Sequence, residues 1–199
     1  MVHIIYYGAG NIRSVSKAIE AVGAQVKITE DPKDIEKADK IVLPGVGAFG
    51  KAVEALKARN LIEPVRSAIM ENKPFLGICL GMQLFFAESD ENPGTKGLSV
   101  LDGRVSRFPA GLKVPHLGWN QVRQAAPSPL WKGVPDQSFF YFAHSYYAAP
   151  DDERVTAGIT AYPFEYTSSV WKDSLFGLQF HPEKSQKWGL KILENFVKI

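Results

Sequence analysis

The sequence predicts an α/β fold: a three-layer, mostly parallel open sheet with helices on both faces, plus a smaller antiparallel sheet in the C-terminal half. Up to about residue 88, short apolar runs of strand type alternate with segments of helical periodicity, which is typical of a covered parallel sheet. After about residue 90, short strand-like segments separated by Pro and Gly follow one another, which favours antiparallel pairing. The 199 residues contain no linker-like tract, so we expect a single domain over residues 1–199.

Charge and cysteine content narrow the classes of function. The 23 Lys and Arg residues nearly balance 21 Asp and Glu residues, which argues against nucleic acid or an acidic membrane surface as a partner. The single cysteine excludes an internal disulfide framework and fits a reducing compartment. No apolar segment reaches the roughly 20 residues of a membrane span, and the N-terminus enters a strand without a basic leader. We therefore expect a cytoplasmic protein.

The first predicted strand, Val2–Tyr7, is followed by a glycine-containing turn and a helix. Asn11 is the expected N-cap, apolar residues recur at helical spacing from Ile12 to Val22, and Gly23 is the expected stop. A glycine pair after a first strand is also found in dinucleotide-binding folds. The third glycine of that fingerprint would fall at Arg13, so the pattern argues against nucleotide binding.

Further strands and helices alternate up to the middle of the chain. The expected elements are a strand over Gln25–Thr29, a helical turn over Asp34–Ala38, a strand over Lys40–Leu43, and helices over about 48–58 and Leu61–Glu71. The segment Pro44–Gly50 has three glycines between a strand and a helix. Such a loop exposes backbone N–H groups that can bind an anion or an oxyanion, although it is also an ordinary strand-to-helix connection.

The most informative stretch is the apolar run that ends in Gly77-Ile78-Cys79-Leu80-Gly81. A strand followed by a helix, expected over Leu80–Glu88, with small residues two positions on either side of a cysteine, is typical of a nucleophile elbow. The sulfur would then lie over a helix N-terminus, which favours the thiolate. A lone cysteine is more often a small buried apolar residue, so the interpretation requires a base elsewhere in the chain.

The C-terminal half predicts turns and short strands. Its expected elements are a turn at Asn92-Pro93-Gly94, a hairpin over Val100–Val105 with Asp102-Gly103 at its corner, strands over Phe139–Phe142, Val155–Thr160, Ser168–Trp171 and Leu175–Phe180, and a helix over Gln186–Val197.

The required base follows the last of these strands. In an extended segment, residues two apart point to the same side, so His181 and Glu183 would share a face. A carboxylate next to an imidazole fixes its tautomer and stabilises the imidazolium, as in a catalytic triad. We therefore expect Cys79, His181 and Glu183 to perform acyl transfer through a covalent intermediate. The N–H of Leu80 and an N–H of Val46 or Gly47 are the expected oxyanion donors.

These residues resemble the class I (triad) glutamine amidotransferases, and among them the glutaminase subunits of imidazole glycerol phosphate synthases of histidine biosynthesis. The resemblance covers essentially the whole chain. The matching stretches are Tyr7–Asn11, Pro44–Gly50, Gly77–Gln83, Pro115–Asn120, Phe142–Tyr146 and Gln179–Ser185.

The resemblance implies hydrolysis of glutamine to glutamate and ammonia, with no cofactor and no metal. It also implies that the ammonia passes to a (β/α)8-barrel cyclase subunit in a heterodimer. By matching position, the residues implied to bind glutamine are Gln83, Glu91, Tyr141, Ser145 and Tyr146. Those implied to lie at the partner interface are Asn11, Arg13, Trp119, Asn120 and Lys184.

Three alternatives stay open at this point. Another triad amidotransferase subunit, such as those of anthranilate or aminodeoxychorismate synthesis, shares the elbow, but Gly118-Trp119-Asn120 argues against it. A non-catalytic interaction module would not need Cys79, His181 and Glu183 together. A redox-sensing cysteine would need a resolving partner, and the chain has only one cysteine.

The four histidines are scattered along the chain, which argues against a zinc site.

Overall fold

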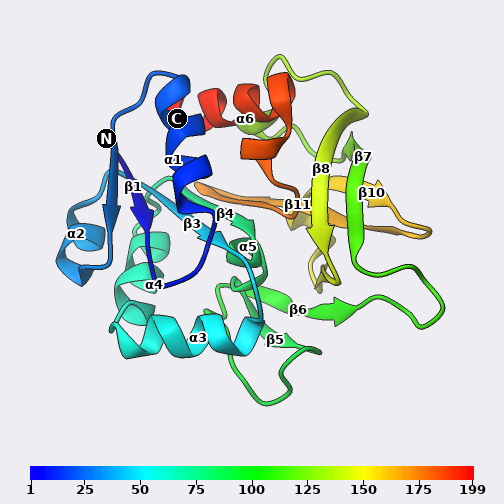
Figure 1. Ribbon diagram of the computed structural model, residues 1–199, viewed down its shortest axis with the longest axis horizontal. Coiled ribbons are helices and arrows are strands. Elements are labelled where there is room, and N and C mark those ends of the chain that lie inside the picture. The colour runs from blue at the N-terminus through cyan, green and yellow to red at the C-terminus, as the bar shows by residue number, and fades with distance from the viewer.

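The computed structural model describes all of residues 1–199 (Figure 1). The helices are α1 (Ile12–Ala21), α2 (Pro32–Lys37), α3 (Phe49–Ala58), α4 (Ile62–Met70), α5 (Leu80–Gln83) and α6 (Gln186–Lys198). The strands are β1 (Val2–Ile5), β2 (Val26–Thr29), β3 (Lys40–Gly45), β4 (Phe75–Cys79), β5 (Phe86–Ser89), β6 (Leu101–Arg107), β7 (His116–Gln124), β8 (Ser138–His144), β9 (Tyr146–Pro150), β10 (Thr156–Ala161), β11 (Glu165–Lys172) and β12 (Leu175–Leu178). Each element predicted before residue 80 is confirmed in type, with small differences at the ends.

The parallel part of the sheet has the order β2-β1-β3-β4-β12. The last strand of the chain therefore lies directly beside β4, with Leu178 paired to Ile78. Strands β3, β4 and β12 are almost entirely buried, as expected for a parallel sheet that is covered on both faces. Their carboxyl ends meet at one edge of the sheet, so the residues that follow them come together there.

Helices cover both faces of the parallel strands, which confirms the three-layer prediction (Figure 1). Leu56 of α3 and Val65 of α4 belong to one apolar core, whereas Ile19 of α1 and Phe196 of α6 belong to the other. Each helix turns one apolar stripe inward because its buried residues recur at helical spacing. None of the helices is both long enough and apolar enough to cross a membrane.

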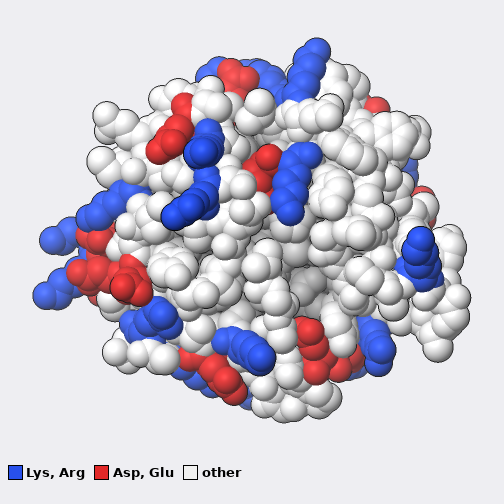
Figure 2. Space-filling view, in the orientation of Figure 1, with Lys and Arg blue, Asp and Glu red and all other residues white.

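The antiparallel strands continue the sheet beyond β12 in the order β11-β10-β7-β8. In a second branch, β9 pairs antiparallel with β11 and β6, and β6 pairs in parallel with β5. The predicted antiparallel half is thus confirmed, and it joins the parallel strands through β12 and β11. On the face in Figure 2, acidic and basic side chains are interspersed around an uncharged centre, in keeping with the balanced composition.

The predicted hairpin at Asp102-Gly103 is wrong, because both residues lie within β6, where its pairing with β5 shifts in register. Gly103 has φ +115°, and a Cβ there would lie 2.4 Å from the carbonyl oxygen of Ala149 in β9. The glycine therefore permits a close approach of two strands rather than a turn.

The predicted helix over Leu80–Glu88 is also too long, because α5 ends at Gln83 and Phe86–Ser89 form β5. Leu84, Phe85 and Phe86 are all completely buried, and the chain leaves the helix here because Phe86 pairs with Leu101 of β6. The carbonyl groups of Leu84 and Phe85 accept hydrogen bonds from the chain near residue 100 instead.

Candidate active site

Cys79 is the corner residue between β4 and α5. Its backbone has φ 55° and ψ −112°, a left-handed conformation that non-glycine residues rarely adopt. Such strain persists only where the surrounding structure imposes it, and it is typical of nucleophile elbows. The thiol is free and only 6% of the residue is exposed.

The two flanking glycines are required by close packing around the elbow. A Cβ on Gly81 would lie 1.8 Å from the carbonyl oxygen of Leu43, and a Cβ on Gly77 would lie 2.5 Å from the ring of Phe85. Helix α5 therefore lies directly over the ends of β3 and β4. The spacing seen in the sequence follows from this contact, since any side chain at either position would push the helix away from the sheet.

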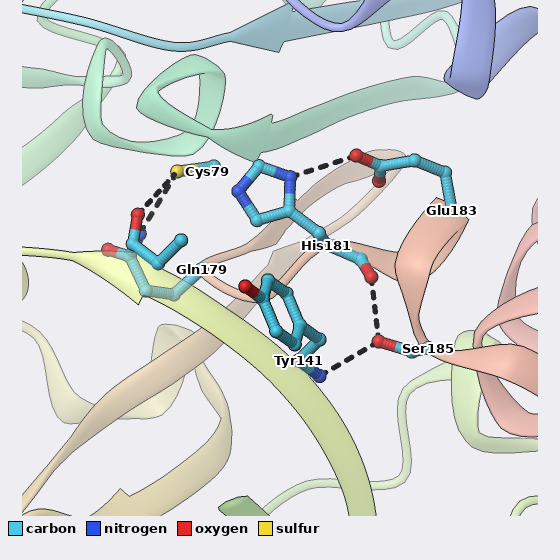
Figure 3. A network of polar contacts seen from close by, with 7 residues as sticks. Cys79, Tyr141, Gln179, His181, Glu183 and Ser185 are labelled. Carbon is cyan, nitrogen blue, oxygen red and sulfur yellow. Dashed lines mark hydrogen bonds and ion pairs between the residues drawn. The ribbon is translucent and has the colours of Figure 1, made fainter. Parts of the chain in front are cut away.

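His181 follows β12, and the pairing of β12 with β4 brings it beside the elbow. Its Nδ1 lies 2.9 Å from Oε1 of Glu183, and both side chains are buried. In Figure 3 the imidazole lies between Cys79 and Glu183, with its other nitrogen turned toward the sulfur. Cys79, His181 and Glu183 are thus brought together in the predicted order.

The local conformation that joins His181 to Glu183 differs from the prediction. Pro182–Lys184 form a 3-10 turn rather than an extended segment. The turn folds Glu183 back onto the imidazole, so the pairing does not depend on strand alternation. The hydroxyl of Ser185 donates to the His181 carbonyl at 2.6 Å and accepts from the Tyr141 N–H at 3.0 Å, which anchors the turn to β8 (Figure 3).

The electrostatics of the pair favour a protonated imidazole. Burial lowers the pKa of His181, but the hydrogen bonds and charges of Cys79 and Glu183 together outweigh it and raise the pKa to about 10. The second carboxylate oxygen of Glu183 is buried without a hydrogen-bond partner. An imidazolium between a sulfur and a carboxylate stabilises a thiolate, which is the nucleophilic form of cysteine.

A cavity of about 350 Å³ opens in front of the sulfur. It is lined by Val46, Gly47, Cys79, Leu80, Gln83, Glu91, Pro115, Ala143, His144, Ser145, Tyr146, His181 and Lys184. The predicted oxyanion donors and four of the five predicted glutamine-binding residues lie on its wall. A concave site with a few convergent polar groups beside a nucleophile can hold a small polar substrate.

The predicted loop over Pro44–Gly50 is shorter in the structure, because Pro44 and Gly45 end β3, and Phe49 and Gly50 begin α3. The remaining loop, residues 46–48, borders the cavity on one side. The N–H groups of Val46 and Gly47 donate to no protein group, and Gly47 has φ +98°. Beyond the loop, Glu91 Oε2 accepts the N–H of Phe49 at 2.7 Å, which caps the start of α3. Val46 and Gly47 therefore line the cavity with N–H groups that are unpaired in the protein, while Glu91 fixes the start of the helix that follows.

Tyr141 is the predicted glutamine-binding residue that lies outside the cavity. Its ring packs against Trp119, with centroids 6.1 Å apart, and Lys184 Nζ lies 5.6 Å from its centroid. Trp119 is 46% exposed on the outer face of β7. Lys184, one of the predicted interface residues, also lines the cavity. Because the Tyr141 ring contacts both Trp119 and Lys184, it connects the exposed tryptophan to the rim of the cavity.

The other predicted interface residues are spread more widely. Asn11 does not cap α1 with its side chain, and it borders a narrow space beside His181 and Glu183. Arg13 is exposed in the first turn of α1. Asn120 is half-buried and donates to the Ala161 carbonyl at 3.0 Å, so it is engaged within the fold.

Sequence reasoning assigned no role to Gln179 or to the buried histidines. Gln179 Nε2 lies 3.7 Å from Cys79 Sγ, and its Oε1 accepts from Gln83 Nε2 at 2.9 Å. Its position two residues before His181, at the end of a strand beside the elbow, could have indicated it. His144 lines the cavity and contacts His116 and Tyr166. Nothing in the sequence pattern indicated that network.

The chain matches the family described as glutamine amidotransferase class-I over residues 3–199. It is 48% identical over 198 residues to "Imidazole glycerol phosphate synthase subunit HisH" of Desulfitobacterium hafniense, covering 100% of this chain and 94% of that protein. It is 49% identical over 199 residues to the protein of the same name from Methanothermobacter thermautotrophicus, covering 100% and 98%.

The fold is shared with more distant proteins of known structure. The structure described as PurLQS from Thermotoga maritima is 16% identical, has a TM-score of 0.78, and is matched over 99% of this chain and 97% of that one. The family match spans almost the whole chain, and the two relatives are nearly half identical to it. The chain therefore belongs to the class-I glutamine amidotransferases and, within them, to the family of HisH subunits of imidazole glycerol phosphate synthase.

Proposed function

We propose that Cys79, His181 and Glu183 form the catalytic triad with which this amidotransferase hydrolyses glutamine to glutamate and ammonia. The observation that carries the proposal is the buried 2.9 Å bond between His181 and Glu183, with the elbow sulfur on the other side of the ring (Figure 3). The site lies in a cavity of a size that suits an amino acid.

The chemistry follows from the raised pKa of His181. The thiolate of Cys79 attacks the side-chain amide carbon of glutamine, and the carbonyl electron pair moves to the oxygen. Collapse breaks the C–N bond while the His181 imidazolium protonates the departing nitrogen, which releases ammonia. Neutral His181 then removes a proton from water, and the hydroxide attacks the thioester and expels the thiolate. Glu183 holds the ring in position throughout.

The negative oxygen of both tetrahedral intermediates requires donors. The N–H of Leu80, the first residue of α5, and the unpaired N–H of Val46 or Gly47 belong to residues that line the cavity, and we assign them this role. Donors placed where charge develops contribute about 100- to 1,000-fold to the rate of comparable reactions.

The remainder of the cavity suits the amino-acid end of glutamine. Glu91 uses one oxygen to cap α3, which leaves its other oxygen for the substrate ammonium. Gln83 uses both amide protons on protein carbonyls, so its Oε1 is the group free to accept from a ligand. Ser145 and Tyr146 complete this side of the cavity.

The outer face of the β7–β8 ribbon supports docking of a cyclase subunit with a (β/α)8-barrel. Leu117, Trp119 and Phe139 are 64%, 46% and 53% exposed. They share a face because the register pairs Leu117 with Ala143 and Gln121 with Phe139. An exposed tryptophan surrounded by apolar and polar groups is a typical interface anchor. Its ring contacts Tyr141 near the cavity rim, so ammonia released there would enter the partner rather than water.

A catalytic thiol functions only while it stays reduced, which supports the cytoplasm as the location.

The unbroken path of strands from β2 to β8 supports a single domain over residues 1–199.

The direct test is a glutaminase assay of the wild type and Cys79→Ala in the presence of the cyclase subunit. We expect the variant to release no glutamate above background while its affinity for the cyclase subunit stays unchanged. Hydrolysis by the variant at the wild-type rate would reject the triad.

The docking face is tested separately by Trp119→Ala. Removal of a central aromatic anchor is expected to raise the Kd for the cyclase subunit about 30-fold. Met70→Ala is the matched control, because Met70 is an exposed apolar residue on α4, outside the ribbon. Equal affinities of the two variants for the cyclase subunit would show that Trp119 is not part of the interface.

A further inference from the structure

A chain of hydrogen-bonded polar groups, most of them buried side chains, crosses the antiparallel half and ends at Cys79. In order, its members are Asn120, His116, Tyr166, His144, the Tyr146 carbonyl, Gln83, Gln179 and Cys79. His116, His144 and Tyr166 are less than 9% exposed. Buried polar groups are costly unless every donor meets an acceptor, so the arrangement fixes where each proton lies.

The outer end of the chain sets the tautomer of His116. Asn120 Oδ1 accepts the Gln121 N–H at 2.8 Å, which identifies the other atom of the amide as its nitrogen. That nitrogen donates to the Ala161 carbonyl at 3.0 Å and has a second proton for His116 Nε2 at 3.3 Å. His116 Nε2 is therefore the acceptor, and the proton of the neutral ring is on Nδ1.

The inner end sets the tautomer of His144. Its Nδ1 lies 2.8 Å from the carbonyl oxygen of Tyr146, which can only accept. Nδ1 of His144 is therefore the donor, and Nε2 is left without a proton. Burial lowers the pKa of His116 to about 4 and that of His144 to about 3, so both rings are neutral at physiological pH.

Tyr166 joins the two rings. Its hydroxyl lies 3.1 Å from His116 Nδ1 and 3.0 Å from His144 Nε2. His116 Nδ1 also lies 3.1 Å from His144 Nε2 itself. With His116 Nδ1 as a donor and His144 Nε2 as an acceptor, the hydrogen bond runs from the first ring to the second, both directly and through the hydroxyl, which accepts from His116 and donates to His144. Every donor from Asn120 to the Tyr146 carbonyl then points in the same direction, and no member lacks a partner.

The Tyr146 carbonyl is where this chain meets the active site. It accepts from His144 and also from Gln83 Nε2 at 2.9 Å. Gln83 Nε2 gives its second proton to Gln179 Oε1, and Gln179 Nε2 points to the Cys79 sulfur. The orientation of the Gln83 amide, and with it the direction of its free Oε1, therefore depends on where the Tyr146 carbonyl is held.

We propose that His116, Tyr166 and His144 are positioning residues for glutamine hydrolysis: they form a one-way chain of neutral donors that fixes the Tyr146 carbonyl, and thereby the Gln83 amide, in the substrate cavity. This inference rests on the proposed function. It assigns the histidines no proton transfer, because the proton on each ring stays at Nδ1 throughout the reaction.

The first test needs no variant of the network and no activity. In ¹⁵N-histidine-labelled full-length protein, the ring nitrogens of His116 and His144 are expected to show a protonated Nδ1 and an unprotonated Nε2, with no titration between about pH 5 and 8. Free imidazole side chains in water prefer the proton on Nε2, so the expected pattern is diagnostic. A proton on Nε2 of either ring, or titration in that range, would overturn the proposal.

The second test compares His144→Asn with His144→Leu in glutaminase assays with the cyclase subunit. The asparagine amide can replace the Nδ1–H donor to the Tyr146 carbonyl, whereas leucine of similar size cannot. We expect His144→Leu to raise the KM for glutamine about tenfold with a smaller change in kcat, and His144→Asn to stay within about threefold of the wild type. Equal impairment of both variants, or none in either, would contradict a positioning role.

The proposed function and the positioning role of His116, Tyr166 and His144 are rejected by different results. An inactive wild type with the expected tautomers would reject the proposed function and leave the hydrogen-bond chain intact. An active wild type with an unaffected His144→Leu variant would reject the positioning role alone. Thermal unfolding of each variant establishes that a loss of activity does not come from loss of the fold.

Discussion

The side-chain amide of Gln179 donates to the sulfur of Cys79 over 3.7 Å, although the two residues are 100 positions apart in the chain. The contact arises because β12 lies beside β4 in parallel register, so the residues that follow the two strands meet at one edge. Together with His181, Gln179 gives the sulfur a second side-chain donor, and donors to sulfur favour the thiolate.

Gln179→Met is therefore expected to weaken the nucleophile. Methionine has a similar length and no N–H donor, so the thiolate loses a hydrogen bond and kcat/KM for glutamine falls about tenfold. Because Cys79 is the only cysteine, the rate of alkylation by iodoacetamide as a function of pH reports on this sulfur alone. The rate of alkylation at neutral pH is expected to fall in the variant. A curve that coincides with that of the wild type would show that the Gln179 contact does not stabilise the thiolate.

Glu183→Gln keeps the size of the side chain and removes its charge. Since Glu183 is one of the groups that raise the pKa of His181, that pKa is expected to fall in the variant. The ring also loses the partner that selects its tautomer, and kcat is expected to fall at least about 100-fold. The pKa is measured by NMR titration of His181 and kcat by glutamate release. An unchanged pKa would contradict the electrostatic role of the carboxylate.

The buried histidines predict loss of stability in acid. The pKa values of His116 and His144 are lowered to about 4 and about 3, whereas a histidine in the unfolded chain titrates near about 6.5. Between these values the unfolded chain binds more protons, so the free energy of unfolding decreases as the pH falls. Each ring contributes a slope of up to about 1.4 kcal/mol per pH unit.

Urea unfolding at several pH values measures this slope. The double variant His116→Asn, His144→Asn serves as the reference, because asparagine retains an amide donor at each position and does not titrate in the range. A slope that is identical in the wild type and the double variant would assign the acid sensitivity to other groups. His181 acts in the opposite direction: its raised pKa contributes stability that is lost as the pH rises from about 6.5 toward about 10.

Gly81→Ala is expected to destabilise the fold severely. The added Cβ would lie 1.8 Å from the Leu43 carbonyl oxygen, which is a backbone atom that cannot move aside. We expect a loss of about 3 kcal/mol or more in the free energy of unfolding. Gly23→Ala is the control, with φ +90° but no atom within 4 Å of the new Cβ, and an expected cost of about 1 kcal/mol. Similar costs for the two variants would show that α5 can shift away from the sheet.

The strands and helices of the parallel half could be predicted because the strands are buried on both faces and the helices on one stripe. This burial imposes the apolar runs and the helical periodicity that the sequence shows. The two errors occurred where a local signal was outweighed by tertiary packing. Asp102-Gly103 is a strong turn signal, yet Gly103 is needed because β9 passes too close to it to leave room for a side chain. The apolar run at Leu84–Phe86 fits a helix equally well until the pairing of Phe86 with Leu101 is known.

The grouping of Cys79, His181 and Glu183 could be predicted because these residues carry short sequence signals: glycines around Cys79 and an acid two residues after His181. The conformation between His181 and Glu183 could not, since a 3-10 turn and an extended segment both bring the pair together. Gln179 and the His116–Tyr166–His144 chain lack such signals. Their partners are separated by tens of residues, and only the register of β7, β8 and β11 brings them together.

The place of β12 between β4 and β11 has a consequence for how the protein is made. The ribosome synthesises the sulfur-bearing corner well before the segment that carries His181 and Glu183, so a chain that stops before residue 181 has the thiol without the imidazole. The sulfur and the ring meet only when β12 lies beside β4, so the proposed hydrolysis requires the last strand to be in place.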